Sequence, residues 1–156
     1  MGMKIKEVVV IAHNVRSMYN VGSIFRTAEG AGVAKLYLTG YTPYPPRPEI
    51  AKVALGSEKR LSWEQIGRVG DLISDLKQSG YLIVALEQDN RSIDYRKFRP
   101  TKSKVALIVG NEVRGVSKPL RDVSDVIIEI PMKGQRKSLN VSVAFGVAVY
   151  QLSKYI

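Results

Sequence analysis

Cysteine is absent from the 156-residue sequence, and histidine occurs only once, as His13. The lack of cysteine excludes disulfides and thiolate metal sites, and a single histidine excludes any metal site built from several imidazoles. The sequence also lacks a run of about 18 apolar residues, so no membrane span is expected. Its first residues, MGMKIKEVVV, hold too short an apolar stretch for a signal peptide. We therefore expect a cytoplasmic protein that has neither a metal ion nor a membrane partner.

Acidic residues are few compared with basic ones. The 14 Asp and Glu residues stand against 24 Lys and Arg, which gives a net charge of +10. Such an excess favours a polyanionic partner, although a soluble protein can also simply be basic. Two clusters favour a nucleic acid, one over residues 91–104 and one at Lys133, Arg136 and Lys137. Tyr95 and Phe98 lie within the first cluster, where they could stack on bases or anchor a loop.

Short apolar runs recur along the chain and are bounded by polar or turn-forming residues. They predict buried strands over residues 7–12, 35–39, 81–86, 105–109 and 126–130. Helical patterns lie between them, and strands separated by helices imply crossovers in a parallel sheet. The sequence thus predicts an α/β fold, with a mainly parallel sheet and helices on both of its faces. The length fits one domain over residues 1–156, with no separate RNA-binding domain.

Three segments before residue 81 predict helices. Asn20 is expected to be the N-cap of the first, and residues 49–55 form the second. The third is expected to begin at Ser62 and Gln65, which form an S-x-x-Q capping box, and to end at Gly80.

Residues 141–149 allow two interpretations. Every second residue is apolar, as in a strand, but apolar side chains also cover nearly all sides of a helix drawn through them. Ser138 and Asn140 are good N-caps and favour the helix. A helix that is apolar all round must be buried on more than one side, and a homodimer interface would bury it.

The segment from Gly110 to Ser117 follows an apolar strand and resembles a phosphate-binding P-loop, G-x-x-x-x-G-K-[ST]. Val116 stands where that motif requires lysine, whose ammonium contacts the β- and γ-phosphates. ATP hydrolysis is therefore not expected.

Polar clusters follow three of the predicted strands, close to where each strand ends. They are Asn14, Arg16, Asn20 and Arg26, then Asn111 and Glu112, then Ser138 and Asn140. One such cluster alone could serve as caps and turns. Three of them favour a ligand site, because ligands bind at the carboxyl ends of parallel strands.

The segments NVRSMYNVGSIFRTA, LIVGNEVRGVS and IPMKGQRKSLNVSVA resemble the three signature motifs of SpoU-type (TrmH-like) RNA ribose 2′-O-methyltransferases of the SPOUT class. KVALGSE, between the first two motifs, extends the similarity over most of the chain. The resemblance implies a C-terminal trefoil knot and S-adenosylmethionine as the cofactor. It also implies RNA as the substrate, tRNA as the first choice and rRNA as the second, with a homodimer as the working unit.

By this resemblance, six residues hold the cofactor: Leu86, Glu87, Gly110, Ile130, Met132 and Leu139. Glycine at position 110 permits a close backbone approach. The apolar side chains at 130, 132 and 139 could sandwich an adenine, or could simply pack in the core.

The reaction attacks a sulfonium methyl group with a ribose hydroxyl, which must lose its proton and be aligned. The resemblance places Arg26 at the reacting ribose and implies that it is the base. Because guanidinium is normally protonated, a role in positioning phosphate or in stabilising the transition state is equally compatible. The other catalytic residues that it implies are Asn20, Glu112, Ser138 and Asn140. We expect Glu112 to orient Arg26 or Asn20. RNA contacts are expected at Asn14, Arg16, Arg114, Lys133, Arg136 and Lys137.

The predicted function is S-adenosylmethionine-dependent methylation of a ribose 2′-hydroxyl in RNA. The alternative is a non-catalytic RNA-binding protein built on the same scaffold. That alternative predicts RNA affinity that falls steeply with salt, without a cofactor-dependent product.

Overall fold

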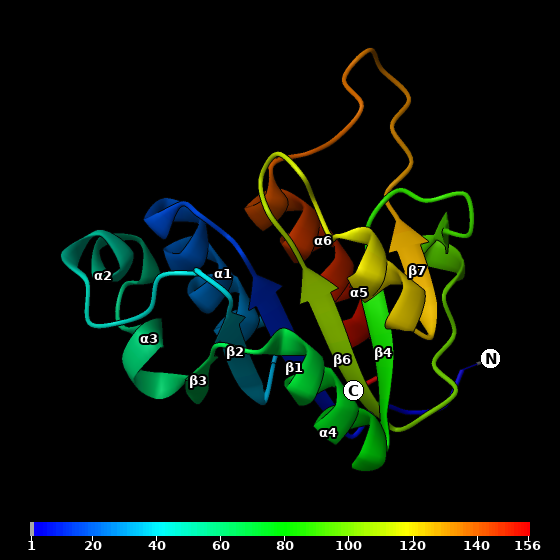
Figure 1. Ribbon diagram of the computed structural model, residues 1–156, viewed down its shortest axis with the longest axis horizontal. Helices are drawn as coiled ribbons and strands as arrows, with labels where there is room; N and C mark the ends of the chain where they lie inside the picture. Colours follow the sequence, from blue (N-terminus) through cyan, green and yellow to red (C-terminus); the bar gives the residue numbers. More distant parts are fainter. Residues whose placement is uncertain (1) are drawn as a thin grey trace.

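A seven-stranded parallel sheet forms the centre of the structure, a computed structural model that describes residues 2–156 (Figure 1). The strand order is β3-β2-β1-β6-β4-β7-β5, and every pair of neighbours is parallel. The strands are β1 (Glu7–His13), β2 (Lys35–Thr39), β3 (Trp63–Ile66), β4 (Tyr81–Leu86), β5 (Ile93–Asp94), β6 (Lys104–Val109) and β7 (Val126–Glu129). The five predicted strands are confirmed, and β3 and β5 are additional.

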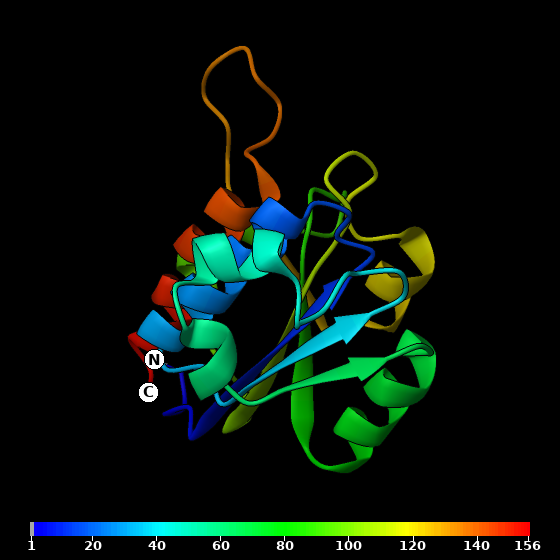
Figure 2. The same ribbon diagram turned by 90° about the vertical axis from the view of Figure 1, so that its left-hand side faces the viewer.

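Helices cover both faces of the sheet, as the sequence predicted (Figure 2). On one face lie α1 (Met18–Gly30), α2 (Pro48–Ala54), α3 (Ser57–Arg60) and α6 (Val141–Ser153). On the other lie α4 (Val69–Gln78) and α5 (Lys118–Val123). A single turn of 3₁₀ helix, η1 (Tyr95–Lys97), follows β5. None of the helices in the described part of the chain is long and apolar enough to cross a membrane.

Strand alternation divides the core into two layers. Along β1, Val8, Val10 and Ala12 face the layer beneath α1 and α6, whereas Val9 and Ile11 face the layer beneath α4 and α5. Successive side chains in a strand point to opposite faces, so an uninterrupted apolar run is required when helices cover both. This requirement explains why the central strands are apolar at nearly every position.

Two predicted helix starts are wrong. The residues expected to open a helix after Ser62 instead form β3, which pairs in parallel with residues 36–39 of β2, and α4 begins only at Val69. Trp63 also packs edge-on against Phe25, with ring centroids 6.4 Å apart. Sheet pairing and this aromatic contact outweigh the local capping box, because a cap contributes only about 1 kcal/mol.

The N-cap of α1 is Ser17 and not Asn20. The Ser17 side chain accepts a hydrogen bond from the Asn20 backbone N–H at 3.2 Å, which places Asn20 inside the first turn. The Asn20 side chain is therefore free for a tertiary contact, although only 4% of the residue is exposed.

Residues 141–149 are helical, and Asn140 is the N-cap that the sequence predicted. Its Oδ1 accepts hydrogen bonds from the backbone N–H groups of Ser142 at 2.9 Å and Val143 at 3.4 Å. One side of α6 packs against α1 and β6. On the other side Val143 and Tyr150 are each about half exposed, so the described chain buries only part of this apolar helix.

Candidate functional site

A cavity opens at the edge of the sheet where the parallel strands end. Loops that follow β4, β6 and β7 line it, together with the first turn of α6. Its empty space, open mouth included, is about 760 Å³. The segment from β7 to α6 projects beyond the body of the molecule above it (Figures 1 and 2).

All six residues predicted to hold the cofactor line this one cavity: Leu86, Glu87, Gly110, Ile130, Met132 and Leu139. Val109, Val141 and Ala144 add further apolar wall. Apolar surface suits an adenine ring, and the lining residues Glu112 and Glu129 carry negative charge, which suits the positive charges of S-adenosylmethionine. The residues present therefore fit the expected cofactor in their chemistry.

Glu87 shapes the wall of the cavity through its carboxylate. Oε1 accepts a hydrogen bond from the Val116 N–H at 2.8 Å, and Oε2 accepts one from the Gln88 N–H at 2.9 Å. A Cβ at Gly115 would lie 1.8 Å from Oε1, and Gly115 has a φ of +68°, so this contact requires glycine. The carboxylate thus holds the loop after β6 against the end of β4.

Gly110 requires glycine for a reason other than the predicted approach to a ligand. A Cβ on Gly110 would lie 2.4 Å from the carbonyl oxygen of Gly115. Asn111 and Gly115 exchange two backbone hydrogen bonds, at 2.9 and 3.2 Å, which close the loop back on itself. Gly110 therefore permits the loop to fold tightly, and the cavity wall follows from that fold.

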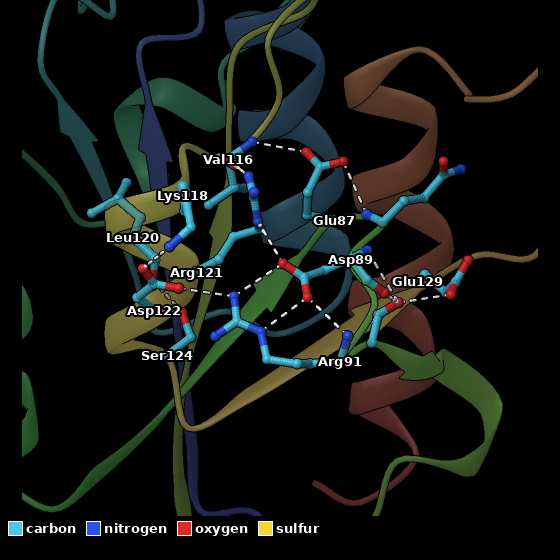
Figure 3. A network of polar contacts seen from close by, with 12 residues as sticks. Glu87, Asp89, Arg91, Val116, Lys118, Leu120, Arg121, Asp122, Ser124 and Glu129 are labelled. Carbon is cyan, nitrogen blue, oxygen red and sulfur yellow. Dashed lines mark hydrogen bonds and ion pairs between the residues drawn. The ribbon is translucent and has the colours of Figure 1, made fainter.

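An ion-pair network that the sequence analysis missed supports the same loop (Figure 3). Arg121 donates from Nε to Asp89 Oδ2 at 2.8 Å and from Nη1 to the Val116 carbonyl oxygen at 2.6 Å. Arg91 donates from Nε to Asp89 Oδ1 at 3.0 Å and from Nη2 to Asp122 at 2.9 Å. The side chain of Asp89 is only 6% exposed, and its hydrogen bonds from Arg91 lower its pKa far below the usual range.

Val116 is consequently held on both sides, by Glu87 at its N–H and by Arg121 at its carbonyl. The network also reduces the free charge of the predicted basic cluster. Arg91 pairs with Asp89 and Asp122, so its first role is within the protein.

Glu112 joins the loop after β6 to the start of α1. Its carboxylate accepts hydrogen bonds from the Arg16 N–H at 2.9 Å, the Ser17 N–H at 2.8 Å and the Asn20 Nδ2 at 2.9 Å. Burial alone would raise the pKa of Glu112, but the hydrogen bonds from Arg16, Asn20 and Ser17 outweigh it and hold the pKa below its ordinary value. The carboxylate remains ionised at neutral pH. Glu112 was expected to orient Arg26 or Asn20, and it contacts Asn20.

The third motif meets the first through two amides. Asn140 donates from Nδ2 to the Asn20 Oδ1 at 3.4 Å, while its own Oδ1 caps α6. Ser138 is exposed and lines the cavity. Glu112, Asn20 and Asn140 thus connect, in that order, one residue from each of the three motifs.

Arg26, a predicted catalytic residue, lies outside the cavity. It lies in the third turn of α1, is exposed, and does not line the cavity. No hydrogen bond or ion pair to its guanidinium occurs within residues 2–156. The single chain therefore leaves this guanidinium free, on the helix face that also carries Tyr19.

The residues predicted to contact RNA lie in two groups. Arg16 is exposed beside the Glu112 network, and Arg114 lines the cavity. Asn14 is half-buried, and its Oδ1 accepts the Tyr41 N–H at 3.0 Å, so this oxygen is already used. The second group is exposed along the projecting loop: Lys133, Arg136 and Lys137. Across residues 2–156, no cluster of three or more His, Asp or Glu side chains could hold a metal ion.

Comparisons with known proteins show which family the chain resembles. Residues 7–150 match the SpoU rRNA Methylase family. The tRNA (guanosine(18)-2′-O)-methyltransferase of Aquifex aeolicus is 35% identical over 150 residues, which cover 96% of this chain and 70% of that protein.

Two solved structures share the fold. The AdoMet-bound rRNA methyltransferase from Sinorhizobium meliloti superposes with a TM-score of 0.91 at 28% identity, over 100% of this chain and 59% of that one. The A. aeolicus TrmH/SpoU tRNA modifying enzyme gives a TM-score of 0.84 at 31% identity, over 99% of this chain and 77% of that one. This chain thus spans little more than half of the Sinorhizobium protein. By the match over residues 7–150, the chain belongs to the SpoU rRNA methylase family, the RNA 2′-O-methyltransferases that its three motifs predicted.

Proposed function

We propose that this protein methylates a ribose 2′-hydroxyl of tRNA, with rRNA as the second choice of substrate, and uses S-adenosylmethionine as the methyl donor. The observation that carries the proposal is the cavity of about 760 Å³, whose lining includes all six expected cofactor residues. Relatives named as a tRNA (guanosine(18)-2′-O)-methyltransferase and an AdoMet-bound rRNA methyltransferase support both the reaction and the choice of substrates.

When bound, the cofactor supplies an electrophilic methyl group on a sulfonium, and its thioether leaves without needing an acid. The chain must hold it and exclude water, which suits the apolar wall of Leu86, Ile130, Met132 and Leu139. Glu112 and Asn140 fix the side-chain amide of Asn20 from opposite sides. Asn20 can then position the incoming ribose, while the ionised Glu112 acts as an anchor and is too weak a base to be useful.

Arg26 has the role of aligning the ribose or its phosphate, or of accepting the hydroxyl proton. Its exposed position on α1 fits this role if the working unit is a homodimer. The exposed apolar residues Tyr19, Val143 and Tyr150 lie on α1 and α6, two helices in mutual contact. A second copy that covers this face would bury them and would bring Arg26 into the interface. A cytoplasmic location and the family's trefoil knot belong to the same proposal.

The test is nucleoside mass spectrometry after incubation with unmodified tRNA or rRNA. A cofactor that carries a trideuteriomethyl group labels every methyl that the protein transfers. We expect a labelled 2′-O-methylnucleoside from wild-type protein and none from Arg26→Ala. Calorimetry should give equal cofactor affinity for the two proteins, because Arg26 lies outside the cavity. Turnover by Arg26→Ala would refute its role, and an absence of both product and cofactor binding would favour the non-catalytic RNA-binding alternative.

A further inference from the structure

A second hollow lies in the loop between β2 and α2, which is composed of residues 40–47 and is here called the tyrosine loop. Its empty space, open solvent included, is about 700 Å³, and its lining includes Tyr41, Tyr44, Arg47 and three prolines. Tyr41 is 60% exposed and Tyr44 is 48% exposed. Two large aromatic rings therefore offer surface to a ligand, at a place that none of the three motifs includes.

The tyrosine loop is held in place by the end of β1. Its Tyr41 N–H donates to Asn14 Oδ1 at 3.0 Å, and its Thr42 hydroxyl donates to the Ala12 carbonyl oxygen at 3.0 Å. The Val15 N–H in turn donates to Thr42 Oγ1 at 3.0 Å. These hydrogen bonds fix the loop at Tyr41 and Thr42, so this part of it loses little conformational entropy when a ligand binds and the Tyr41 ring is preorganised.

The charge beside these rings favours an anion. Arg47 is exposed and has neither a hydrogen bond nor an ion pair to its guanidinium within residues 2–156. Arg16 is also exposed, one residue from the Val15 that anchors the loop. The lining of the hollow contains no carboxylate. Aromatic faces next to arginine are the arrangement that binds unpaired nucleotides, because bases stack while cations contact the backbone.

The tyrosine loop also adjoins the candidate methyl-transfer site. The Tyr41 hydroxyl accepts a hydrogen bond from Asn111 Nδ2 at 2.9 Å, and Asn111 lines the cofactor cavity. We infer that the tyrosine loop is a stacking subsite for an unpaired nucleotide of the RNA substrate, adjacent to the nucleotide that is methylated. This inference rests on the proposed function for the identity of the RNA.

RNA affinity, measured by fluorescence anisotropy at fixed salt, tests the subsite directly. The probes are unmodified tRNA and a fully paired RNA duplex of similar length and charge. Stacking predicts that Tyr41→Ala and Tyr44→Ala each lower affinity for tRNA by about 5- to 150-fold and leave duplex affinity within about twofold. Tyr41→Phe keeps the ring and should bind tRNA as the wild type does. Arg47→Ala should weaken both probes, because it removes a backbone contact.

Lys6→Ala is the matched control, since Lys6 is exposed and precedes β1 at the opposite edge of the sheet. Wild-type tRNA affinity in both tyrosine-to-alanine variants would overturn the inference, and so would equal losses for tRNA and duplex. A cofactor affinity that falls as much as RNA affinity would indicate a structural role instead, and would also overturn it. Wild-type protein that binds tRNA through these residues but forms no methylated product would refute the proposed function and leave the subsite intact.

Discussion

Replacing Glu112 by glutamine tests the hydrogen bonds that connect the first two motifs. The wild-type carboxylate accepts three N–H groups, from Arg16, Ser17 and Asn20. A glutamine amide keeps one oxygen, which can still accept from Ser17 and Asn20. Its NH₂ group then faces the N–H of Arg16, so two donors oppose each other and the third hydrogen bond is lost.

The size of the effect follows from that count. A hydrogen bond to a charged group contributes about 1.5–3 kcal/mol, and Glu112→Gln breaks one and weakens two. The free energy of unfolding should therefore fall by about 2–4 kcal/mol, which lowers Tm by roughly 4–16 °C for a chain of this size. Turnover should also weaken, because the hydrogen bond that anchors the Asn20 side chain becomes weaker.

The pH dependence of the stability difference tests whether the Glu112 carboxylate is its cause. The pKa of Glu112 is lowered in the folded state, so its stabilising contribution is present above the unfolded-state pKa of about 4.3 and is lost as pH falls through the folded-state pKa. The difference in stability between wild type and Glu112→Gln should therefore be full at pH 7 and shrink below about pH 4.

Thermal unfolding of both proteins across this pH range is the assay, with Glu7→Gln as the control. The Glu7 carboxylate has no hydrogen bond or ion pair within residues 2–156, and its replacement should change stability by less than about 0.5 kcal/mol. An unchanged Tm for Glu112→Gln, or a difference that is constant with pH, would refute the reasoning.

Three other changes probe the cavity and the projecting loop. Arg121→Met removes the donor to the Val116 carbonyl. It should weaken cofactor binding by about tenfold in calorimetry and leave RNA affinity unchanged. Cofactor affinity equal to that of the wild type would contradict this prediction. Gly115→Ala places a Cβ against Glu87 at a residue with positive φ. It should lower the free energy of unfolding, measured with urea, by about 1–3 kcal/mol. A variant as stable as the wild type would show that the loop adapts. The last change replaces by alanine the basic side chains of the segment between β7 and α6, namely Lys133, Arg136 and Lys137. The slope of log affinity for RNA against log salt concentration should become shallower by about one unit per lost phosphate contact, and cofactor affinity should stay unchanged. An unchanged slope would exclude phosphate contacts by these three side chains.

Patterns that act over a few residues were sufficient for much of the fold. Apolar runs located five strands, because a strand covered on both faces must be apolar at successive positions. The cap at Asn140 located α6 correctly, since the capping hydrogen bonds reach only two and three residues along the chain. The three motifs identified the family, and the resemblance named six of the residues that line the cavity.

Other features depended on contacts between distant segments, which local patterns do not encode. The segment after Ser62 became β3 because β2 offered a free edge, and Ser17 displaced Asn20 as the cap of α1. The Arg121–Asp89 pair joins residues 32 positions apart, and it pairs charges that composition alone would count as free.

The sequence by itself determined that polar residues follow the ends of the strands at the carboxyl edge of the sheet, because strand periodicity follows from local order, and its resemblance to the family named the residues expected to hold the cofactor. Only the tertiary structure decided how each residue is used. Glu87 and Glu112 serve as acceptors for backbone N–H groups from other loops, and Arg26 is exposed and does not line the cavity. The physical reason is that a buried carboxylate must be paired with donors, and the chain supplies those donors only once distant loops have met.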